Sequence, residues 1–244
     1  MPFSVAFRTD ASLQIGNGHV MRCLTLATAL KARGAACHFI CREHPGNLIE
    51  LLRDRGFAVT ALTADDPGVR TGVPDGASPS PNAEWLGASW QADAEATREI
   101  LQSLAPDWLV VDHYALDRAW EQTLRPCCKH MMVIDDLADR PHECDLLLDQ
   151  NLGRVAADYA GLVPESCTVL AGTRYALLRP EFAALREYSL QRRKSPQLRQ
   201  LLISMGGVDR SNATGQILDA LRQCSLPQDC RIIVVMGPHA PWLQ

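Results

Sequence analysis

The sequence predicts an α/β protein built from two doubly wound parallel-sheet domains, the second of them incomplete in this chain. Short apolar runs alternate with amphipathic stretches through most of the chain. The runs WLVVD, MMVID and CDLLLD each end in an acid, and continuous apolar runs are typical of strands that are buried on both faces of a parallel sheet. Strands that alternate with helices in this way indicate a doubly wound architecture.

Each element of the first domain, which we expect to span residues 1–180, is predicted by its own pattern. Apolar runs predict strands over residues 3–8, 36–41, 57–62, 108–112, 131–135, 144–149 and 167–170. Apolar residues at helical spacing predict helices over residues 18–32, 48–55, 92–103 and 117–124. Residues 63–82 are rich in Asp, Gly, Pro and Ser and are expected to form a loop.

A linker and the start of a second domain follow. Residues 181–190 have helical spacing and residues 191–199 are polar and basic, so we expect a linker helix and linker over residues 181–198. The pattern restarts with a strand, a glycine turn, a helix and a second strand, at residues 201–204, 205–207, 212–222 and 231–235. These elements are too few for a domain of about 100 residues, so we expect the second domain, residues 199–244, to be truncated here.

Composition and charge exclude several classes of function. The formal net charge of −4 argues against a nucleic-acid partner, because such binding needs a basic face that neutralises phosphates. No apolar run approaches the roughly 18 to 20 residues of a membrane helix, and the first residues lack the pattern of a signal peptide. We therefore expect a cytoplasmic protein with no membrane partner.

The nine cysteines are odd in number and include no C-x-x-C pair, which favours reduced thiols over a disulfide framework. Cys127, Cys128 and His130 lie close together, but no second ligand cluster has matching spacing. We therefore expect no metal site and no cofactor.

The first motif with chemical meaning is QIGNGH, between the first predicted strand and the helix that follows it. Gly16 and Gly18 let the backbone approach a ligand closely, and a helix start offers free N–H groups to a phosphate or an oxyanion. The run is no dinucleotide fingerprint, because Arg22 stands near the place of the third glycine. His19 is placed for proton transfer near neutral pH; the alternative is that it only caps or packs locally.

The second motif is Asp112-His113-Tyr114, which ends the predicted strand WLVVD. Ligands bind at the carboxyl ends of the strands in open α/β sheets. A tyrosine hydroxyl can orient a water or a sugar there, and an acid can orient an imidazole. The alternative is that Asp112 caps a turn and Tyr114 packs on the rim.

Two more turns are candidates for substrate contact. Asp135 and Asp136 end the next strand, and because adjacent side chains point in different directions, at most one of them is expected to face the cleft. We interpret them as substrate-orienting or turn-forming. Gly206 and Gly207 stand between a strand and a helix, where they predict a phosphate cradle in the second domain, with a plain tight turn as the alternative.

Several segments, taken in order along the chain, resemble one family. They are FRTDASLQIGNGH-x-x-R, VVDHY, IDDLADRPHECDLLLDQN, DYAGLVPE, GTRYALLRPEF and ISMGG-x-D. They resemble the UDP-sugar hydrolases of pseudaminic acid biosynthesis, which act on UDP-linked 2,4-diacetamido-2,4,6-trideoxy-altropyranose. This family is similar in fold to the glycosyltransferases made of two Rossmann-like domains (GT-B type), and its pathway serves flagellin glycosylation and surface polysaccharide.

The resemblance implies a reaction and the residues that perform it. Water attacks the anomeric carbon, UDP leaves, and the sugar is released with inverted configuration, without a metal and by a monomer. The UDP-linked amino sugar is the implied partner, and residues 199–244 would help to bind its nucleotide. Implied catalytic residues are His19 as general base, Tyr114 and Asp112. Implied substrate-binding residues are Asp10, Gly16, Asn17, Gly18, Arg22, His113, Gly206 and Gly207.

Two departures from the family pattern leave alternatives open. Members of the family continue with a Ser-rich loop and an Asn-Glu pair that hold uridine and ribose, so this chain is expected to bind UDP weakly. Val208 stands where relatives often have threonine, which removes one hydroxyl. The rival interpretations are a GT-B glycosyltransferase and a truncated, non-catalytic chain that binds a UDP-sugar.

Overall fold

The computed structural model describes residues 3–63, 82–206, 208–237 and 240–243. These residues form two compact units, Met1–Leu177 and Leu178–Gln244. Most of the loop predicted over residues 63–82 lies outside the described residues, and so does Gly207.

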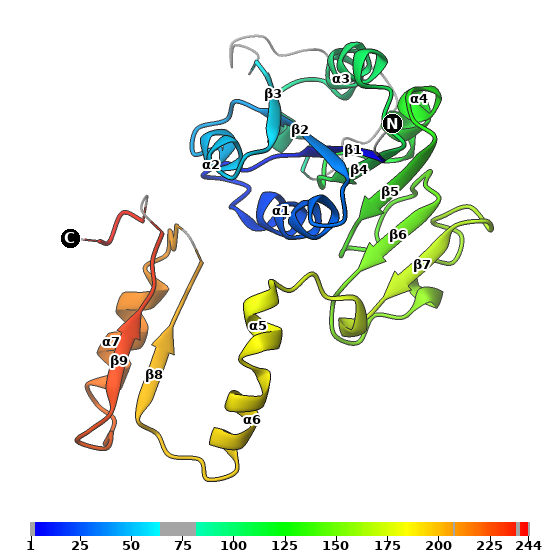
Figure 1. Ribbon diagram of the computed structural model, residues 1–244. Coiled ribbons are helices and arrows are strands. Elements are labelled where there is room, and N and C mark those ends of the chain that lie inside the picture. The colour runs from blue at the N-terminus through cyan, green and yellow to red at the C-terminus, as the bar shows by residue number, and fades with distance from the viewer. Residues whose placement is uncertain (1–2, 64–81, 207, 238–239, 244) are drawn as a thin grey trace. The chain divides into compact units, whose positions relative to one another are not determined.

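A seven-stranded sheet forms the first unit, with every neighbouring pair of strands parallel (Figure 1). The strand order is β3-β2-β1-β4-β5-β6-β7. The strands are β1 (Ser4–Thr9), β2 (Ala36–Arg42), β3 (Ala58–Leu62), β4 (Trp108–Asp112), β5 (His130–Ile134), β6 (Leu146–Asp149) and β7 (Thr168–Ala171). The order reverses between β1 and β4, which is the switch point of a doubly wound sheet. The predicted fold class of this domain is therefore confirmed.

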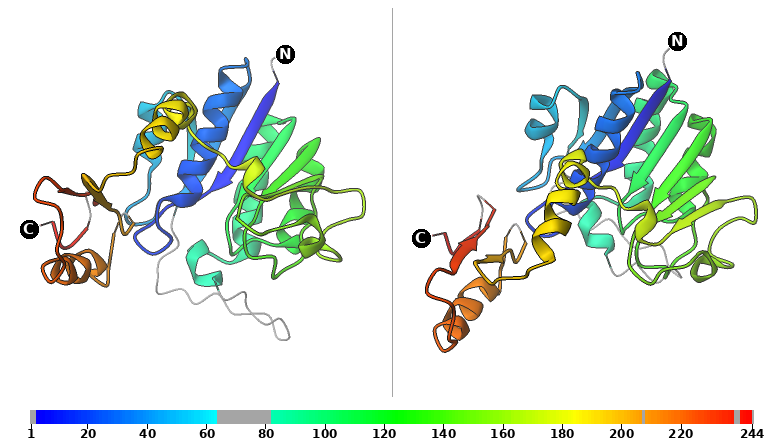
Figure 2. Two further views of the ribbon diagram at one scale, coloured as in Figure 1. Left: turned by 90° about the horizontal axis from the view of Figure 1, so that it is seen from below. Right: turned by 60° about the horizontal axis from the view of Figure 1, so that its bottom comes forward.

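Helices cover both faces of this sheet (Figure 2). They are α1 (Gly18–Lys31), α2 (Ile49–Asp54), α3 (Trp90–Leu104) and α4 (Arg118–Leu124), with single 3₁₀ turns at Ala83–Leu86, Arg125–Cys127, Ala156–Tyr159 and Thr173–Tyr175. All four α-helices and seven strands begin and end within two residues of the predicted bounds. Both periodicities were therefore readable from the sequence.

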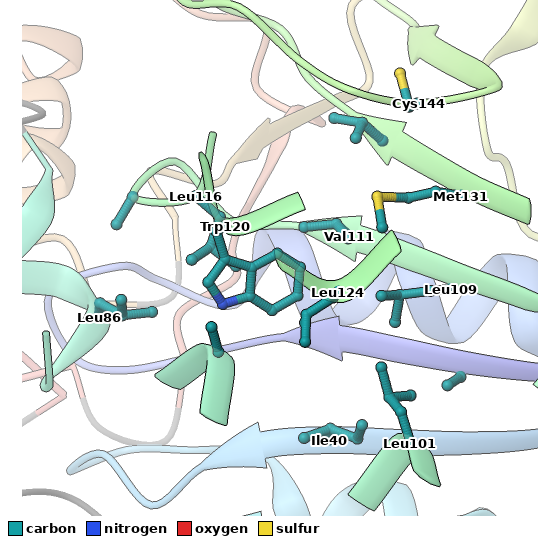
Figure 3. Packing of buried hydrophobic residues seen from close by; sticks show 14 of the residues in the cluster. Ile40, Leu86, Leu101, Leu109, Val111, Leu116, Trp120, Leu124, Met131 and Cys144 are labelled. Carbon is teal, nitrogen blue, oxygen red and sulfur yellow. The ribbon is translucent and has the colours of Figure 1, made fainter. Parts of the chain in front are cut away.

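Alternation along the strands divides the core into two layers. Ala6 faces a cluster that includes Leu101 of α3 and Trp120 of α4 (Figure 3). Its strand neighbour Phe7 faces the other cluster, which includes Val20 of α1. Successive strand residues point to opposite faces, so a central strand must be apolar along its whole length, as the continuous apolar runs indicated.

The second unit is smaller and is described by itself. It contains α5 (Pro180–Ala184), α6 (Arg186–Arg193), β8 (Gln200–Ile203), α7 (Ala213–Leu221) and β9 (Arg231–Val234), and β8 pairs with β9 in parallel. The predicted linker over residues 191–199 was partly wrong, because α6 continues through Arg193. Gln and Arg are good helix formers, and arginines in a last turn complement the helix dipole.

Within the described residues, only the first unit forms a full sheet domain. None of the helices described has the length and apolar character that crossing a bilayer requires.

A buried ion-pair cluster joins β1, β2, α3 and α4. Asp93 of α3 accepts hydrogen bonds from Arg8 Nη2 (2.6 Å), Arg42 Nη2 (2.8 Å) and Trp120 Nε1 (3.0 Å). Arg8 Nη1 also donates to Asp10 Oδ1 at 2.6 Å. Burial alone would raise the pKa of Asp93, but the Arg8 charge and the hydrogen bonds hold it below its ordinary value. This cluster fixes the end of β1 that leads into the QIGNGH segment.

Replacement of Asp93 by alanine should destabilise the first unit strongly. The change leaves two buried guanidinium groups without a shared partner, and breaking a buried ion pair costs about 3–5 kcal/mol. Glu95→Ala is a matched control on the same helix, because Glu95 is exposed and pairs with Arg98 one turn away. Its free energy of unfolding should change by less than about 0.5 kcal/mol. Urea unfolding of both variants measures the difference, and equal losses would contradict the assigned role of Asp93.

Candidate active site

The predicted catalytic residues meet at the switch point of the sheet. His19 is the second residue of α1, which follows β1, and Asp112 is the last residue of β4. These strands are neighbours, with Thr9 paired in register with Asp112. Crevices at a switch point, outside the carboxyl ends of the strands, are where ligands bind in open α/β sheets.

His19 and Asp112 form a buried dyad. His19 Nδ1 lies 2.5 Å from Asp112 Oδ1, and the side chains are 5% and 0% exposed. An ionised carboxylate can only accept a hydrogen bond, so the imidazole proton resides on Nδ1. Nε2 then carries the lone pair that can take a proton. The arrangement turns the histidine into an oriented base.

Arg22 holds the other side of the Asp112 carboxylate. Its Nε donates to Asp112 Oδ2 and its Nη2 to Asp112 Oδ1, both at 2.6 Å, which is the bidentate geometry that arginine forms with carboxylates. Burial acts to raise the pKa of Asp112, but the Arg22 charge and the hydrogen bonds from Arg22 and His19 outweigh it and hold the pKa well below its usual range. Asp112 is therefore ionised when it orients the imidazole.

Tyr114 forms one wall beside the imidazole. Its ring meets the His19 ring edge-on, with centroids 4.5 Å apart, and Trp85 lies behind it at 5.9 Å. Burial and the influence of the Asp136 carboxylate raise the pKa of the Tyr114 hydroxyl. The phenol is therefore neutral near pH 7 and can donate a hydrogen bond.

The glycine segment before α1 is open to a ligand. Gly16 has a φ of +83°, which favours glycine, and its N–H donates to the Ser12 carbonyl at 2.8 Å. A Cβ placed on Gly16 or Gly18 would meet no atom within 4 Å. Asn17 is the N-cap residue, and its side chain makes no capping hydrogen bond. The first turn of α1 is thus left without a side-chain cap, a common setting for anion binding.

Asp10 and His113 are buried, and their side chains contact other residues of the protein. Asp10 Oδ1 accepts from Arg8 Nη1 and from the Arg42 backbone N–H at 2.7 Å, and Asp10 is fully buried. His113 Nε2 stands 3.5 Å from Asp10 Oδ2, and His113 Nδ1 accepts from the Ala115 N–H at 3.0 Å. Direct substrate contact by these two residues stays a prediction; their observed contacts give them a supporting place.

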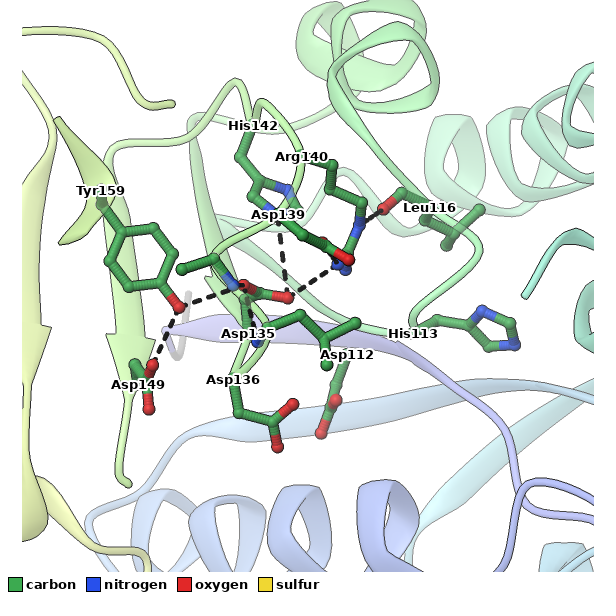
Figure 4. A network of polar contacts seen from close by, with 12 residues as sticks. Asp112, His113, Leu116, Asp135, Asp136, Asp139, Arg140, His142, Asp149 and Tyr159 are labelled. Carbon is green, nitrogen blue, oxygen red and sulfur yellow. Dashed lines mark hydrogen bonds and ion pairs between the residues drawn. The ribbon is translucent and has the colours of Figure 1, made fainter. Parts of the chain in front are cut away.

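Asp135 and Asp136 point in different directions, as expected of adjacent residues (Figure 4). Asp135 turns into a buried network, where it accepts a hydrogen bond from Tyr159 at 3.0 Å and pairs with Arg140 at 2.9 Å. Asp136 instead lies beside Asp112 and accepts from Arg22 Nη1 at 3.0 Å. The contact between Asp136 and Arg22 was missed, because the sequence separates the two residues by more than a hundred positions.

In the second unit, side chains cap the start of the helix that follows the glycine turn, and the phosphate cradle stays a prediction. Gly206 has a φ of +85° and open space around it, whereas Gly207 lies outside the described residues. The first N–H groups of α7 already donate to side chains: those of Ala213 and Thr214 to Asp209, and that of Gly215 to Asn212. A phosphate at this turn would therefore have to use the loop amides before α7 rather than the helix start.

No three His, Cys, Asp or Glu side chains of the described residues are grouped so that they could hold a metal ion. The nine cysteines are all free.

Comparison with known proteins places the chain beside one enzyme. It is 28% identical over 220 residues to the UDP-2,4-diacetamido-2,4,6-trideoxy-beta-L-altropyranose hydrolase of Campylobacter jejuni, a match that covers 89% of the chain and 65% of that hydrolase. The chain resembles a UDP-sugar hydrolase. It is also 23% identical over 236 residues to an uncharacterized protein of Methanocaldococcus jannaschii, covering 96% of the chain and 42% of that protein. No protein-family model matches the chain.

A solved structure has a fold similar to that of this chain. MurG of Acinetobacter baumannii superposes with a TM-score of 0.57 at 14% sequence identity, over 97% of the chain and 61% of MurG. At this identity the likeness concerns the fold alone, which is of the GT-B type. The chain spans less than two thirds of each of these three proteins.

Titration of the buried His113 side chain should make the free energy of unfolding depend on pH. Burial lowers the pKa of His113 from 6.5 to about 4. Between these values the unfolded chain binds a proton that the folded chain does not, so stability falls as the pH drops from 6.5 to 4 and changes no further below that. The contribution is about 3 kcal/mol.

His113→Asn is the matching variant, because its side-chain oxygen can still accept the Ala115 N–H and does not titrate in this range. Urea unfolding at intervals from pH 7 to pH 4 should show a steeper loss of stability for the wild type than for the variant. Parallel curves would show that the pKa of His113 is the same in the folded and unfolded chains, which would contradict the lowered pKa.

Proposed function

We propose that the chain hydrolyses a UDP-activated sugar and releases the free sugar with inversion at the anomeric carbon. The observation that carries the proposal is the buried His19–Asp112 dyad at the switch point of the sheet, with its 2.5 Å contact. The resemblance to the Campylobacter hydrolase supports the choice of reaction. Within the proposal, the substrate is the UDP-linked diacetamido-trideoxy sugar of pseudaminic acid biosynthesis.

The dyad suits the activation of water. A water oxygen forms a bond to the anomeric carbon while the bond from that carbon to the UDP oxygen breaks, and the water proton passes to His19 Nε2. Asp112 accepts a hydrogen bond from the Nδ1–H group and stabilises the imidazolium that results. Attack from the face opposite to UDP inverts the configuration of the sugar.

Departure of UDP builds negative charge on the diphosphate. The first turn of α1 offers N–H groups and a positive dipole beside Gly16 and Gly18, and preorganised donors of this kind stabilise developing charge. Arg22 contributes less here, because its guanidinium is engaged with two carboxylates. Contact of Gly206 and Gly207 with the diphosphate stays a prediction from the sequence.

A glycosyltransferase is the rival function, since the GT-B fold serves UDP-sugar transfer as well. The two functions differ in the acceptor. A hydrolase releases UDP from the UDP-sugar in water alone, whereas a transferase releases it at a comparable rate only when a sugar or lipid acceptor is added.

Replacement of His19 by alanine should lower turnover by at least about 100-fold, the usual contribution of a general base. Phosphorus NMR of UDP release from the UDP-linked diacetamido-trideoxy sugar, without acceptor, measures turnover. Proton NMR of the first sugar formed reports its anomeric configuration. His130→Ala is the control, because this histidine is exposed at the amino end of β5 and should leave turnover within about twofold.

Each other outcome has a definite meaning. Equal release by the wild type and His19→Ala would remove His19 as the base. Retained configuration would rule out a single displacement by water. Release that requires an acceptor would favour the transferase, and no release by the wild type would contradict hydrolysis by this chain.

A further inference from the structure

We propose that Asp136 is a positioning residue, which fixes the orientation of the His19 imidazole through Arg22. Its consequence for catalysis rests on the proposed function, while the arrangement itself can be tested without turnover. Asp136 is the second residue after β5 and is 17% exposed. It has no part in proton transfer as proposed above, and it contacts Arg22, which holds the carboxylate partner of the imidazole.

Arg22 connects Asp136 to Asp112, the carboxylate that contacts the imidazole. This guanidinium has carboxylates on two of its edges: Nε and Nη2 face Asp112, and Nη1 donates to Asp136 Oδ2 at 3.0 Å. An arginine side chain has many rotamers, and a planar group held at two edges keeps only one of them. Asp136 thereby holds the Arg22 guanidinium in the orientation in which it donates to both oxygens of Asp112.

The two hydrogen bonds from Arg22 to Asp112 determine which nitrogen of the imidazole carries the proton. Asp112 Oδ1 accepts from both His19 Nδ1 and Arg22 Nη2. With the guanidinium in place, the carboxylate stays ionised and its Oδ1 stays aimed at Nδ1. If Arg22 swung away, the buried Asp112 would lose two charge-assisted hydrogen bonds and could rotate. The tautomer and direction of His19 would then no longer be fixed.

Tyr114 is the other neighbour of the imidazole. Its ring centroid lies 4.5 Å from that of the His19 ring, with the two rings in a T-shaped arrangement. The Asp136 carboxylate also acts on Tyr114, because it contributes to the raised pKa of the phenol. Asp136 therefore influences residues of two elements, Arg22 on α1 and Tyr114 after β4.

The backbone of Asp136 is held in place by residues farther along the chain. Its carbonyl oxygen accepts from Arg154 Nη2 at 3.0 Å and from Asn151 Nδ2 at 3.4 Å. The carboxylate of Asp135 caps the same turn by accepting from the N–H groups of Leu137 and Ala138. Asp136 is thus carried by a rigid turn, as a residue that positions others needs to be.

The test combines a spectroscopic and a kinetic measurement on Asp136→Ala and Asp136→Asn. The short contact between His19 and Asp112 predicts a strongly deshielded imidazole proton in the proton NMR spectrum, which Asp112→Asn and His19→Gln should remove and so assign. Asp136→Ala should shift or broaden this signal and lower kcat by about tenfold or more, with KM changed little. Asp136→Asn keeps an acceptor for Arg22 and should fall between Asp136→Ala and the wild type.

Asp139→Ala is the matched control. Asp139 lies in the same loop and is 51% exposed, and it pairs with Arg140 rather than with Arg22. It removes one negative charge at nearly the same place, so the deshielded signal and kcat should both stay as in the wild type. Circular dichroism of each variant checks that the fold is kept.

Failure of this inference can be told from failure of the proposed function. An unchanged signal and unchanged kcat in Asp136→Ala, with His19→Ala inactive, would overturn the positioning role and leave the hydrolase proposal standing. A perturbed signal in Asp136→Ala, with full turnover in His19→Ala, would support the arrangement and overturn the role of His19 as base. Equal effects of Asp136→Ala and Asp139→Ala would reduce the role of Asp136 to general charge and overturn the inference.

Discussion

The site depends on the burial of one carboxylate, that of Asp112, at the end of a central strand. A fully buried charge is costly unless it is paired, and His19 Nδ1 together with two nitrogens of Arg22 supplies the partners. The Cys23 thiol adds a weaker contact at 3.5 Å. Because all three of these residues come from the first turns of α1, the same interaction that satisfies Asp112 also ties that helix to the switch point.

A second set of buried charges holds the strand that leads to the Asp112 site. Asp93 and Asp10 neutralise Arg8 and Arg42, and these ion pairs join strands β1 and β2 to α3. Two carboxylates and two guanidinium groups balance in charge, which fits the low pKa and neutral state of His113 beside them. The framework leaves the glycine segment open to solvent while the strand that leads into it is firmly held.

The tandem acids after β5 show how one turn serves two purposes. Asp135 faces inward and stabilises its own loop through Arg140, Tyr159 and two backbone N–H groups. Asp136 faces the site and completes the contacts of Arg22. This division gives each of the two acids its own contacts. Under the proposed function, neither acid is needed as a proton donor, because UDP is a better leaving group than a sugar alcohol.

The sequence by itself determined the elements and the chemical types at the site. Apolar runs and helical spacing are local properties, so the strands, the helices and the positions of His19, Asp112 and Tyr114 at their ends could be predicted from residue order alone. Only the tertiary structure decided the strand order that brings β1 beside β4, the link from Arg22 to Asp136, and the side-chain capping of α7 that occupies its first N–H groups. The physical reason is that pairing between distant segments depends on how strands are ordered and how buried charges find partners, and neither is encoded by the spacing of neighbouring residues.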